Sequence, residues 1–194
     1  MTSFTEMIQW LSPSNPPTAD PAAVAVLNER RTLTLTVDER SQEVALRWDS
    51  EFQVGPNTPH ARIHGPNYDG LGIRLPESFN HLARFQNSAN LPYTAKDTHD
   101  VTIAKWTSVS GKMEGRDVML VMFGRQDNAR GDAAFYTMLD PFAYLSATQG
   151  LDKKPLEYAA GDKFSLSYLL TVYTAIKSPQ VLQARSDRWQ HQRQ

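Results

Sequence analysis

The stretch FSLSYLLTV, residues 164–172, carries apolar side chains at every second position. Successive side chains of a β-strand point to opposite faces of the sheet, so this spacing predicts a strand with one buried face. The turn sequence AAGD at residues 159–162 precedes it and predicts where the strand begins. The alternating apolar positions are Phe164, Leu166, Tyr168, Leu170 and Val172.

The same two-residue period occurs earlier in the chain. Residues 33–37 read LTLTV, and after the polar turn at 38–41 the apolar residues Val44, Leu46 and Trp48 alternate again. This pattern predicts a β-hairpin with one buried face. Residues 118–123 are apolar without alternation, which predicts a central strand covered on both faces.

The remaining segments complete an all-β prediction. Further strands are expected at 68–75, 101–109, 133–138 and 142–147, whereas the polar segment 76–100 is expected to be a long loop. Ser178 and Pro179 form a helix start signal, and the apolar spacing up to Trp189 predicts one C-terminal helix ending near His191. We therefore predict an antiparallel β-sandwich at 23–176, preceded by an apolar lead and Pro-rich linker at 1–22 and followed by a helix and tail at 177–194.

Composition excludes several classes of function. The chain has 194 residues, and its 20 basic and 21 acidic residues give a formal net charge of −1. A nucleic-acid-binding surface needs a basic surplus to contact phosphates, so nucleic acid is not an expected partner. The absence of cysteine excludes disulfides and thiolate ligands, and the histidines show no metal-ligand spacing, so neither metal nor cofactor is expected.

The sequence also predicts no contact with a membrane. The longest strongly apolar run, residues 118–123, is far shorter than the roughly 20 residues that a membrane helix needs. Residues 1–10 lack the basic start and the apolar run of a signal peptide. We therefore expect a cytoplasmic protein.

Five stretches, in order along the chain, resemble a bacterial family labelled "methane oxygenase PmoA-like". They are NERRTL (28–33), YDGLGIR (68–74), AKWTSVSG (104–111), PFAYLSAT (141–148) and FSLSY (164–168), and the resemblance extends over residues 24–190. Members of that family are domains of unknown function that look like galactose-mutarotase-like β-sandwiches and often accompany sugar-processing genes. The resemblance implies a supersandwich fold and a role connected with carbohydrates.

The sequence departs from the family pattern in two places. Family members carry an early segment of the form Asp-His-Pro-His-His-Arg-Gly that is absent here, and this sequence begins where the second half of the family begins. Where the family has His-Pro-Ser-Asn-Pro, residues 124–130 read GRQDNAR. We therefore expect an incomplete supersandwich without any activity that depends on those histidines. Methane oxidation itself is rejected, because it requires membrane helices and copper ligands.

Four candidate binding residues lie around the glycine-bearing strand at 68–75. His60 and His64 are four positions apart, so on a strand they would face the same side and could converge on a sugar or a metal, although no third metal ligand is evident; the alternative is an ordinary loop pair. Asp69 and Arg74 flank Gly70 and Gly72, and both side chains make directional hydrogen bonds that suit sugar hydroxyls. The alternative for this second pair is an internal ion pair that fastens a bulged strand.

Four more candidates lie on the strand at 101–109 or after the strand at 118–123. Arg125, Asp127 and Asn128 follow the end of the second of these strands, where they could form a binding rim or a solvated turn. Trp106 could stack on a sugar ring or belong to the core. Tyr136, Phe142 and Tyr144 are interpreted as core residues.

Three functions remain open from the sequence, and whether the protein is an enzyme is not decided. The first is a carbohydrate-related binding or accessory domain that uses the concave sheet face and the loop at 76–100. The second is a sugar epimerase or lyase-like enzyme that uses His60, His64 and Arg74. The third is an interaction module, including a homo-oligomer, because an incomplete sandwich leaves an apolar sheet face or edge uncovered.

Overall fold

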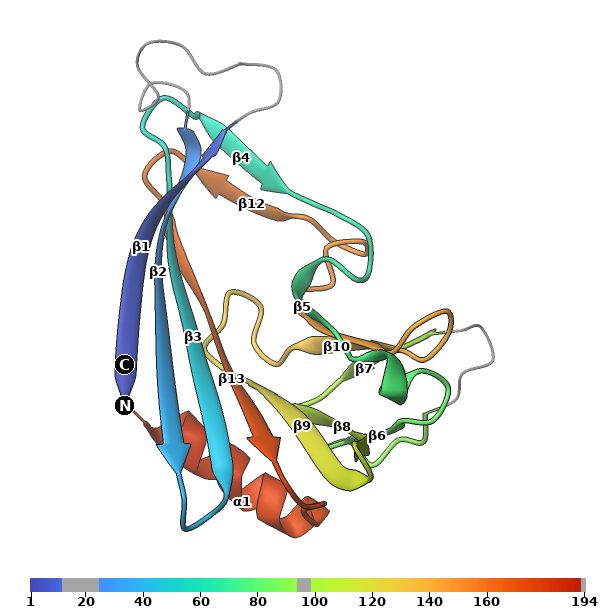
Figure 1. Cartoon of the computed structure of the whole chain (residues 1–194). Helices are drawn as coiled ribbons and strands as arrows, with labels where there is room; N and C mark the ends of the chain where they lie inside the picture. The colour runs from blue at the N-terminus through green and yellow to red at the C-terminus, as the bar shows by residue number, and fades with distance from the viewer. Residues whose placement is uncertain (12–24, 94–98, 193–194) are drawn as a thin grey trace.

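The computed structural model describes residues 1–11, 25–93 and 99–192, and within them the strands form three antiparallel sheets (Figure 1). The large, seven-stranded sheet has the order β1 (Thr2–Leu11), β2 (Ala25–Asp38), β3 (Glu43–Val54), β13 (Lys163–Tyr173), β9 (Arg116–Gly124), β8 (Trp106–Met113) and β6 (Arg84–Asn87). The small, four-stranded sheet has the order β5 (Gly70–Arg74), β11 (Tyr144–Thr148), β10 (Ala134–Met138) and β7 (His99–Ile103). The third sheet pairs β4 (His60–Ile63) with β12 (Leu156–Ala159).

The main core lies between the large and the small sheet. Tyr168 and Leu170 of β13 pack there with Met122 of β9, and Phe135 and Leu145 of the small sheet contact them from the opposite side. We call this side of the large sheet the inner face. The strand predicted from residues 164–172 is confirmed, since β13 pairs with β3 through Phe52↔Phe164 to Val44↔Val172.

A second core lies on the outer face of the large sheet, under the helix α1 (Pro179–His191). Val121 and Phe123 of β9 pack there against Leu182 and Trp189 of the helix. Strand β9 is therefore buried on both faces, as its unbroken apolar run predicted.

The predicted helix is confirmed at both ends. The Ser178 hydroxyl accepts a hydrogen bond from the backbone N–H of Val181, Pro179 occupies the first turn, and the helix ends at His191. Pro179 fits there because the first turn of a helix has no internal partner for a backbone N–H. The all-β antiparallel architecture with one C-terminal helix is thus the observed fold.

Several segments differ from the sequence prediction. Residues 101–109, expected to be one strand, are divided between β7 of the small sheet and β8 of the large sheet. The apolar lead at 1–10 forms strand β1, which pairs with β2 along its whole length. The segment 76–100, expected to be a loop, contains the short 3-10 helix η2 (Glu77–Phe79) and strand β6. Short β4 and β12 were also missed, because four-residue strands carry too little periodicity to be recognised. The Pro-rich linker lies outside the described residues from position 12 onward.

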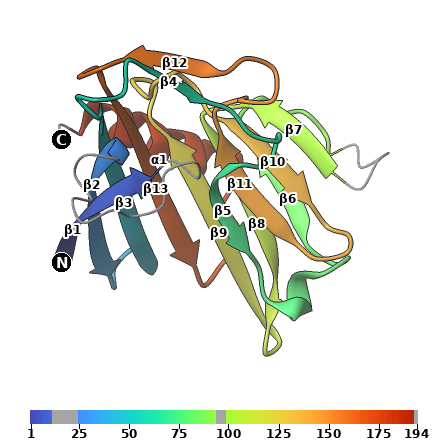
Figure 2. The ribbon, with the colours of Figure 1, turned by 90° about the horizontal axis from the view of Figure 1, so that it is seen from above.

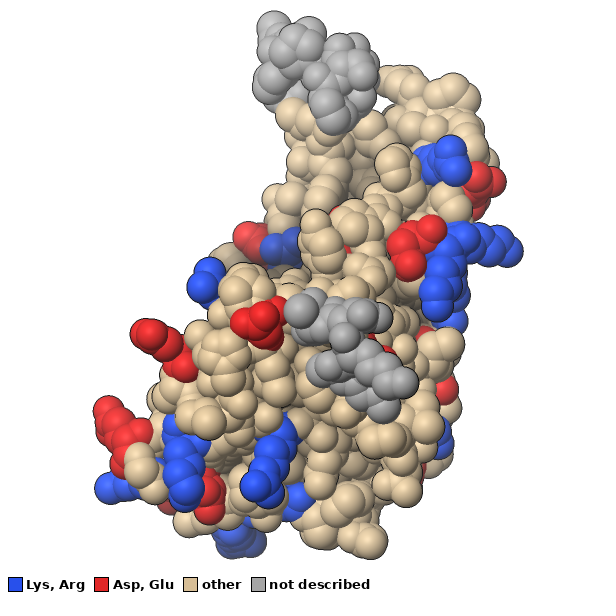
Figure 3. All heavy atoms as spheres, turned by 90° about the vertical axis from the view of Figure 1, so that its right-hand side faces the viewer, with Lys and Arg blue, Asp and Glu red and all other residues tan. Residues whose placement is uncertain are grey.

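The small sheet covers only part of the large one, which leaves room for a groove. The buried residues of the main core come from β13, β9, β8, the small sheet with its flanking residues, and the segment around η2, and none comes from β1 or β2. Seen from above, β1, β2 and β3 lie to one side of the small sheet (Figure 2). On the face turned toward the viewer in Figure 3, acidic and basic side chains are interspersed rather than gathered by sign.

Candidate functional site

A groove of about 460 Å³ lies on the inner face, where β1, β2, β3 and β13 extend past the small sheet. Its second wall comes from the β4–β12 pair and from the start of β5, which stand opposite these strands in Figure 1. This volume lies within the range of about 300–1,000 Å³ that is usual for small-molecule sites. The lining residues used below are Trp10, Glu29, Arg31, Trp48, Ser50, Phe52, His64, Asp69, Gln149, Phe164 and Tyr168.

A buried carboxylate organises the floor of the groove. Glu29 is 1% exposed and accepts four hydrogen bonds. Two come from Arg31 at 2.8 and 2.9 Å, one from the Ser50 hydroxyl at 2.6 Å and one from the indole N–H of Trp10 at 2.9 Å. Because charge-assisted bonds of this kind are strong and directional, they fix the geometry of the groove floor before any ligand arrives. They also occupy Glu29, which is therefore unsuited to act as a general base.

Aromatic rings line the groove beside this network. The Arg31 guanidinium lies 5.0 Å from the ring centre of Trp48, whose N–H donates to Ser50 at 3.2 Å. Phe164 stacks between Phe52 and Tyr158, with ring centres 4.6 and 4.4 Å apart. Trp10 lines the groove and keeps 48% of its surface exposed, although its N–H donates a hydrogen bond to Glu29.

Two buried polar side chains lie deeper in the same lining. Gln149 donates to the Tyr168 hydroxyl at 3.1 Å and to the Thr148 carbonyl at 3.3 Å. The Oε1 atom of Gln149 is buried and accepts no hydrogen bond from the described residues. Burial raises the pKa of Tyr168 to about 12, so its hydroxyl remains protonated at neutral pH.

Two of the eight candidates predicted from the sequence line the groove. They are His64 and Asp69, both exposed and both on the wall opposite β2. His60 does not join them, since it points to Glu157 on β12 with a 4.0 Å separation. The pair therefore does not converge, because β4 ends at Ile63, one residue before His64.

Arg74 lies on the other side of the small sheet, in an aromatic layer on its outside. Its guanidinium stacks on the Phe142 ring at 4.1 Å, and among the described residues it has no ion pair with Asp69. Tyr136 and Tyr144 form an edge-to-face pair in this layer. Tyr136 is 7% exposed, as the sequence predicted for a core residue, whereas Tyr144 is only half-buried and neither belongs to the main core between the sheets. The reason is register, since they occupy the outward positions of β10 and β11 while Phe135 and Leu145 point inward.

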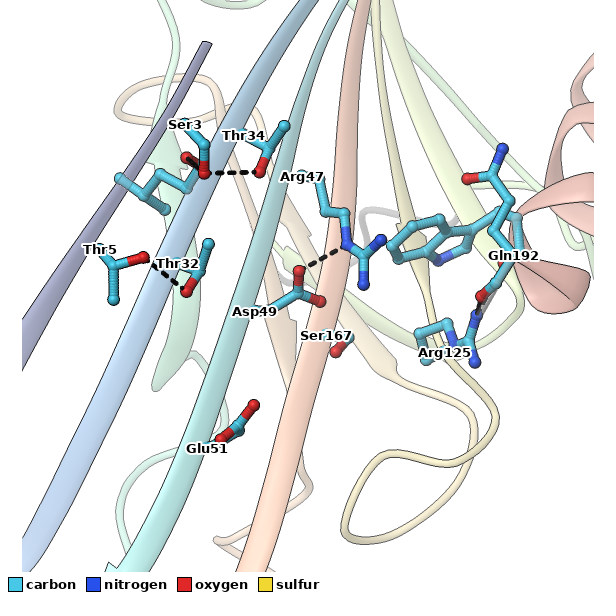
Figure 4. A network of polar contacts seen from close by, with 12 residues as sticks. Ser3, Thr5, Thr32, Thr34, Arg47, Asp49, Glu51, Arg125, Ser167 and Gln192 are labelled. Atoms are coloured by element: carbon cyan, nitrogen blue, oxygen red, sulfur yellow. Dashed lines mark hydrogen bonds and ion pairs between the residues drawn. The ribbon is translucent and has the colours of Figure 1, made fainter. Parts of the chain in front are cut away.

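Of the three candidates after β9, Arg125 holds the C-terminal helix to the sheet with Asp127 as its partner, and Asn128 bonds to β13. Arg125 donates to the backbone carbonyls of Trp189 at 2.8 Å and Gln192 at 2.7 Å, the latter drawn in Figure 4. It also pairs with Asp127 at 3.0 Å and thereby lowers the pKa of that carboxyl. The Asn128 side chain accepts a hydrogen bond from the backbone N–H of Ser167 and donates one to the carbonyl of the same residue. These side chains are engaged within the fold rather than directed at the groove.

Trp106, the remaining candidate, belongs to the core under the helix. It is 2% exposed, and its N–H donates to Gln183 of α1 at 3.2 Å. It cannot present a ring face to a ligand in this position. The tryptophans that can do so, Trp10 and Trp48, were not selected as site residues from the sequence.

One sequence signal could have identified the groove. Glu29 and Arg31 lie an even number of positions from Leu27, Leu33 and Leu35, so on a strand all five side chains point to the same face. Two charged residues therefore occur on a face otherwise predicted to be buried. Charged residues are rarely buried unless they are paired, so this placement indicates an ion pair within the sheet. Trp10 could not be found in this way, because its partner lies across a strand pairing that only the fold creates.

Other parts of the described structure offer less to a ligand. Two further hollows, of about 460 and 650 Å³, involve the segment 76–100, but neither is lined by a buried charged residue. No group of three or more His, Asp or Glu side chains in the described ranges is arranged to hold a metal ion. The described part also contains no helix with the length and apolar character needed to cross a membrane.

Residues 1–187 match the model of a family described as "Family of unknown function (DUF6807)". The chain belongs to this family. The description does not carry the methane oxygenase-like label that the sequence suggested, so that finer resemblance stays a prediction. No curated protein matches the chain.

Among solved structures, the chain is similar to parts of large carbohydrate-active proteins. A polysaccharide lyase matches with a TM-score of 0.39 at 9% identity, over 81% of this chain and 22% of the other. The GH36 α-galactosidase AgaB from Geobacillus stearothermophilus gives a TM-score of 0.35 at 10% identity, over 88% of this chain and 27% of the other. The chain thus spans about a quarter of the length of these proteins. Similarity at these scores carries no argument about the site, which is interpreted from its own geometry.

Proposed function

We propose that this protein is a carbohydrate-binding domain whose ligand lies in the groove between β1, β2, β3 and β13 on one side and β4, β12 and β5 on the other. The single observation that carries this proposal is Trp10. Its indole is half exposed at the groove, yet its N–H is held by a 2.9 Å hydrogen bond to the buried Glu29. An aromatic ring that is rigid before the ligand arrives binds with a small loss of conformational entropy.

The other groups in the lining suit a ligand rich in hydroxyls. Sugars present apolar C–H faces that pack on aromatic rings, and hydroxyls that both donate and accept hydrogen bonds. Trp10 and Trp48 supply ring faces, while Asp69 and His64 supply exposed polar groups on the opposite wall. Asp69 has no ion pair among the described residues.

The arrangement favours binding over catalysis. The buried carboxylate is already occupied by four donors. The enzyme alternative requires His60, His64 and Arg74 in one site, and only His64 lines the groove. General acid–base catalysis needs a group within hydrogen-bond reach of the reacting atoms, so this set cannot act together.

Tryptophan fluorescence tests the proposal directly. Trp106 and Trp189 are 2% and 1% exposed and lie in the core between the helix and the large sheet, so a ligand in the groove should perturb only Trp10 and Trp48. We expect a saturable change with at least one member of a panel of neutral mono- and oligosaccharides, verified by isothermal titration calorimetry. Trp10→Ala should weaken that binding about tenfold, equivalent to roughly 1.4 kcal/mol.

Two further variants separate loss of the site from loss of the fold. Asp69→Ala removes a polar group from the wall opposite β1 and should also weaken binding, whereas Leu82→Ala, at a 77% exposed position away from the groove, should not. The proposal would be overturned if no sugar of the panel changed the fluorescence, or if neither Trp10→Ala nor Asp69→Ala weakened binding.

A further inference from the structure

Strand β1 presents a long edge that is unpaired within the described residues. Its ten residues, Thr2–Leu11, pair with β2 on one side, and no described strand pairs with the other side. Natural edge strands are usually protected by proline, lysine, bulges or short length. Strand β1 has no proline and no basic residue, and its one irregularity lies at its end, between Trp10 and Leu11. This edge is open to pairing with another strand.

Several apolar side chains along β1 are exposed. Phe4 is 56% exposed, Met7 71% and Trp10 48%. The single charged residue, Glu6, pairs with Arg31 of the same chain at 3.2 Å, and Arg31 also pairs with the buried Glu29. The strand therefore offers backbone hydrogen bonds and apolar contacts, with one carboxylate that is already engaged within the same chain.

The residues of β1 and β2 show which side chains an added strand would meet on each face of the large sheet. On the outer face, the hydroxyls of Ser3 and Thr34 lie 3.2 Å apart and those of Thr5 and Thr32 lie 3.1 Å apart, so β1 is fastened to β2 by a polar ladder (Figure 4). On the inner face, Leu35 is 45% exposed. A strand that continues this sheet should match the same division, with apolar residues inside and hydroxyls outside.

We propose that β1 pairs antiparallel with β1 of a second copy of this chain, about a two-fold axis that passes by Met7. Residues directly opposite each other in an antiparallel pair point to the same face, so the axis must pass by a residue rather than between two. Centring on Met7 places Phe4 opposite Trp10 of the second copy on the inner face, twice. Aromatic pairs of this kind stabilise antiparallel sheets.

The neighbouring registers are less favourable. Centring on Glu6 places two carboxylates opposite each other, and like charges in that position are destabilising. Centring on Thr5 leaves Trp10 outside the paired segment, and centring on Ile8 leaves Phe4 unpaired, so both lose the Phe4–Trp10 pairs. Glu6 lies opposite an apolar residue in these two registers and in the Met7-centred one, so it does not distinguish them. Among these registers, the Met7-centred one pairs Phe4 with Trp10 twice, and such a self-complementary edge favours a closed, isologous dimer.

The dimer would join two seven-stranded sheets into one continuous sheet. Because the axis is perpendicular to the sheet, the inner faces of both copies stay on the same side. The two grooves then open in the same direction, which suits a ligand with repeated units. The pairing itself does not depend on what the groove binds.

Light scattering coupled to size-exclusion chromatography tests the pairing. We expect the full chain to elute as a dimer that dissociates on dilution. Met7→Lys places two ammonium groups opposite each other at the axis, so it should raise the dimer dissociation constant at least tenfold. Ile103→Lys is the matched control, because Ile103 is 70% exposed on β7, the edge strand of the small sheet. A monomeric wild type, or a dimer weakened equally by both variants, would overturn the proposal.

Cysteine cross-linking tests the register, and the cysteine-free sequence makes the result unambiguous. Met7→Cys should form a disulfide-linked dimer on mild oxidation. Thr5→Cys and Gln9→Cys should not cross-link alone, because each lies about 13 Å from its own copy at a rise of about 3.3 Å per residue. A mixture of these two variants should cross-link, because Thr5 lies opposite Gln9 of the second copy. Efficient cross-linking of Thr5→Cys alone would overturn the Met7-centred register.

Discussion

The indole N–H of Trp10 donates a 2.9 Å hydrogen bond to Glu29, a residue on the neighbouring strand that is 1% exposed. This contact joins a half-exposed ring on β1 to the most buried carboxylate of the groove. It couples the conformation of the edge strand to the ion pair in the sheet. Removing either partner should therefore affect both stability and the groove.

Glu29→Ala should lower the free energy of unfolding by about 3 kcal/mol, as expected when one partner of a buried ion pair is lost. Arg31 would retain only Glu6, and the donors of Trp10 and Ser50 would lose their acceptor. Urea unfolding followed by circular dichroism measures the change. Glu51→Ala is the control, because its 3.4 Å pair with Arg30 is more than half exposed and should contribute under about 0.5 kcal/mol.

Arg125→Met should destabilise the protein by about 2 kcal/mol, because hydrogen bonds from a charged donor to buried acceptors contribute more than neutral ones. The variant loses the bonds to the carbonyls of Trp189 and Gln192 that hold the end of α1. Hydrogen exchange should accelerate in the last turns of the helix more than in β13. Unchanged exchange in α1 would contradict this role. Arg62→Ala is the control, because this side chain is 61% exposed, and it should leave hydrogen exchange in α1 unchanged.

Stability should fall as the pH rises from 10 to 12. Burial raises the pKa of Tyr168 to about 12, whereas an unfolded tyrosine releases its proton near its ordinary value of 10.0. The unfolded state then binds fewer protons in this range, so the contribution of Tyr168 is complete below pH 10 and declines by up to about 1.4 kcal/mol per pH unit above it. Urea unfolding at several pH values measures this slope. Tyr168→Phe should reduce it, and an identical slope in the variant would refute the assignment.

Two glycine substitutions should differ sharply in cost. An added Cβ at Gly55 would lie 2.0 Å from the backbone carbonyl oxygen of Ala25, so Gly55→Ala forces the backbone apart and should cost about 2 kcal/mol or more. At Gly72 the added Cβ meets the terminal hydroxyl of Tyr144, also at 2.0 Å, and a side-chain end can move. Gly72→Ala should therefore cost under about 1 kcal/mol. Thermal unfolding of the two variants compares them, and equal costs would count against this explanation.

The sequence predicted the fold from local pattern. The alternation around Leu166, the unbroken run at 118–123 and the start signal at Ser178 each reflect the period of one element, so they can be recognised without knowledge of any partner. The same reasoning placed His64 and Asp69 near a site, and both line the groove. It was less informative for Arg125 and Asn128, whose partners lie on elements that a local pattern does not identify.

By itself, then, the sequence determined that this chain forms antiparallel strands with one helix at its end, because the spacing of apolar residues is a local property of the backbone. Tertiary structure decided which polar residues meet. The contacts of Trp10 with Glu29 and of Arg125 with α1 depend on strand register and on which strands become neighbours. Register and strand order are set by the packing of the whole molecule, and no short stretch of sequence contains them.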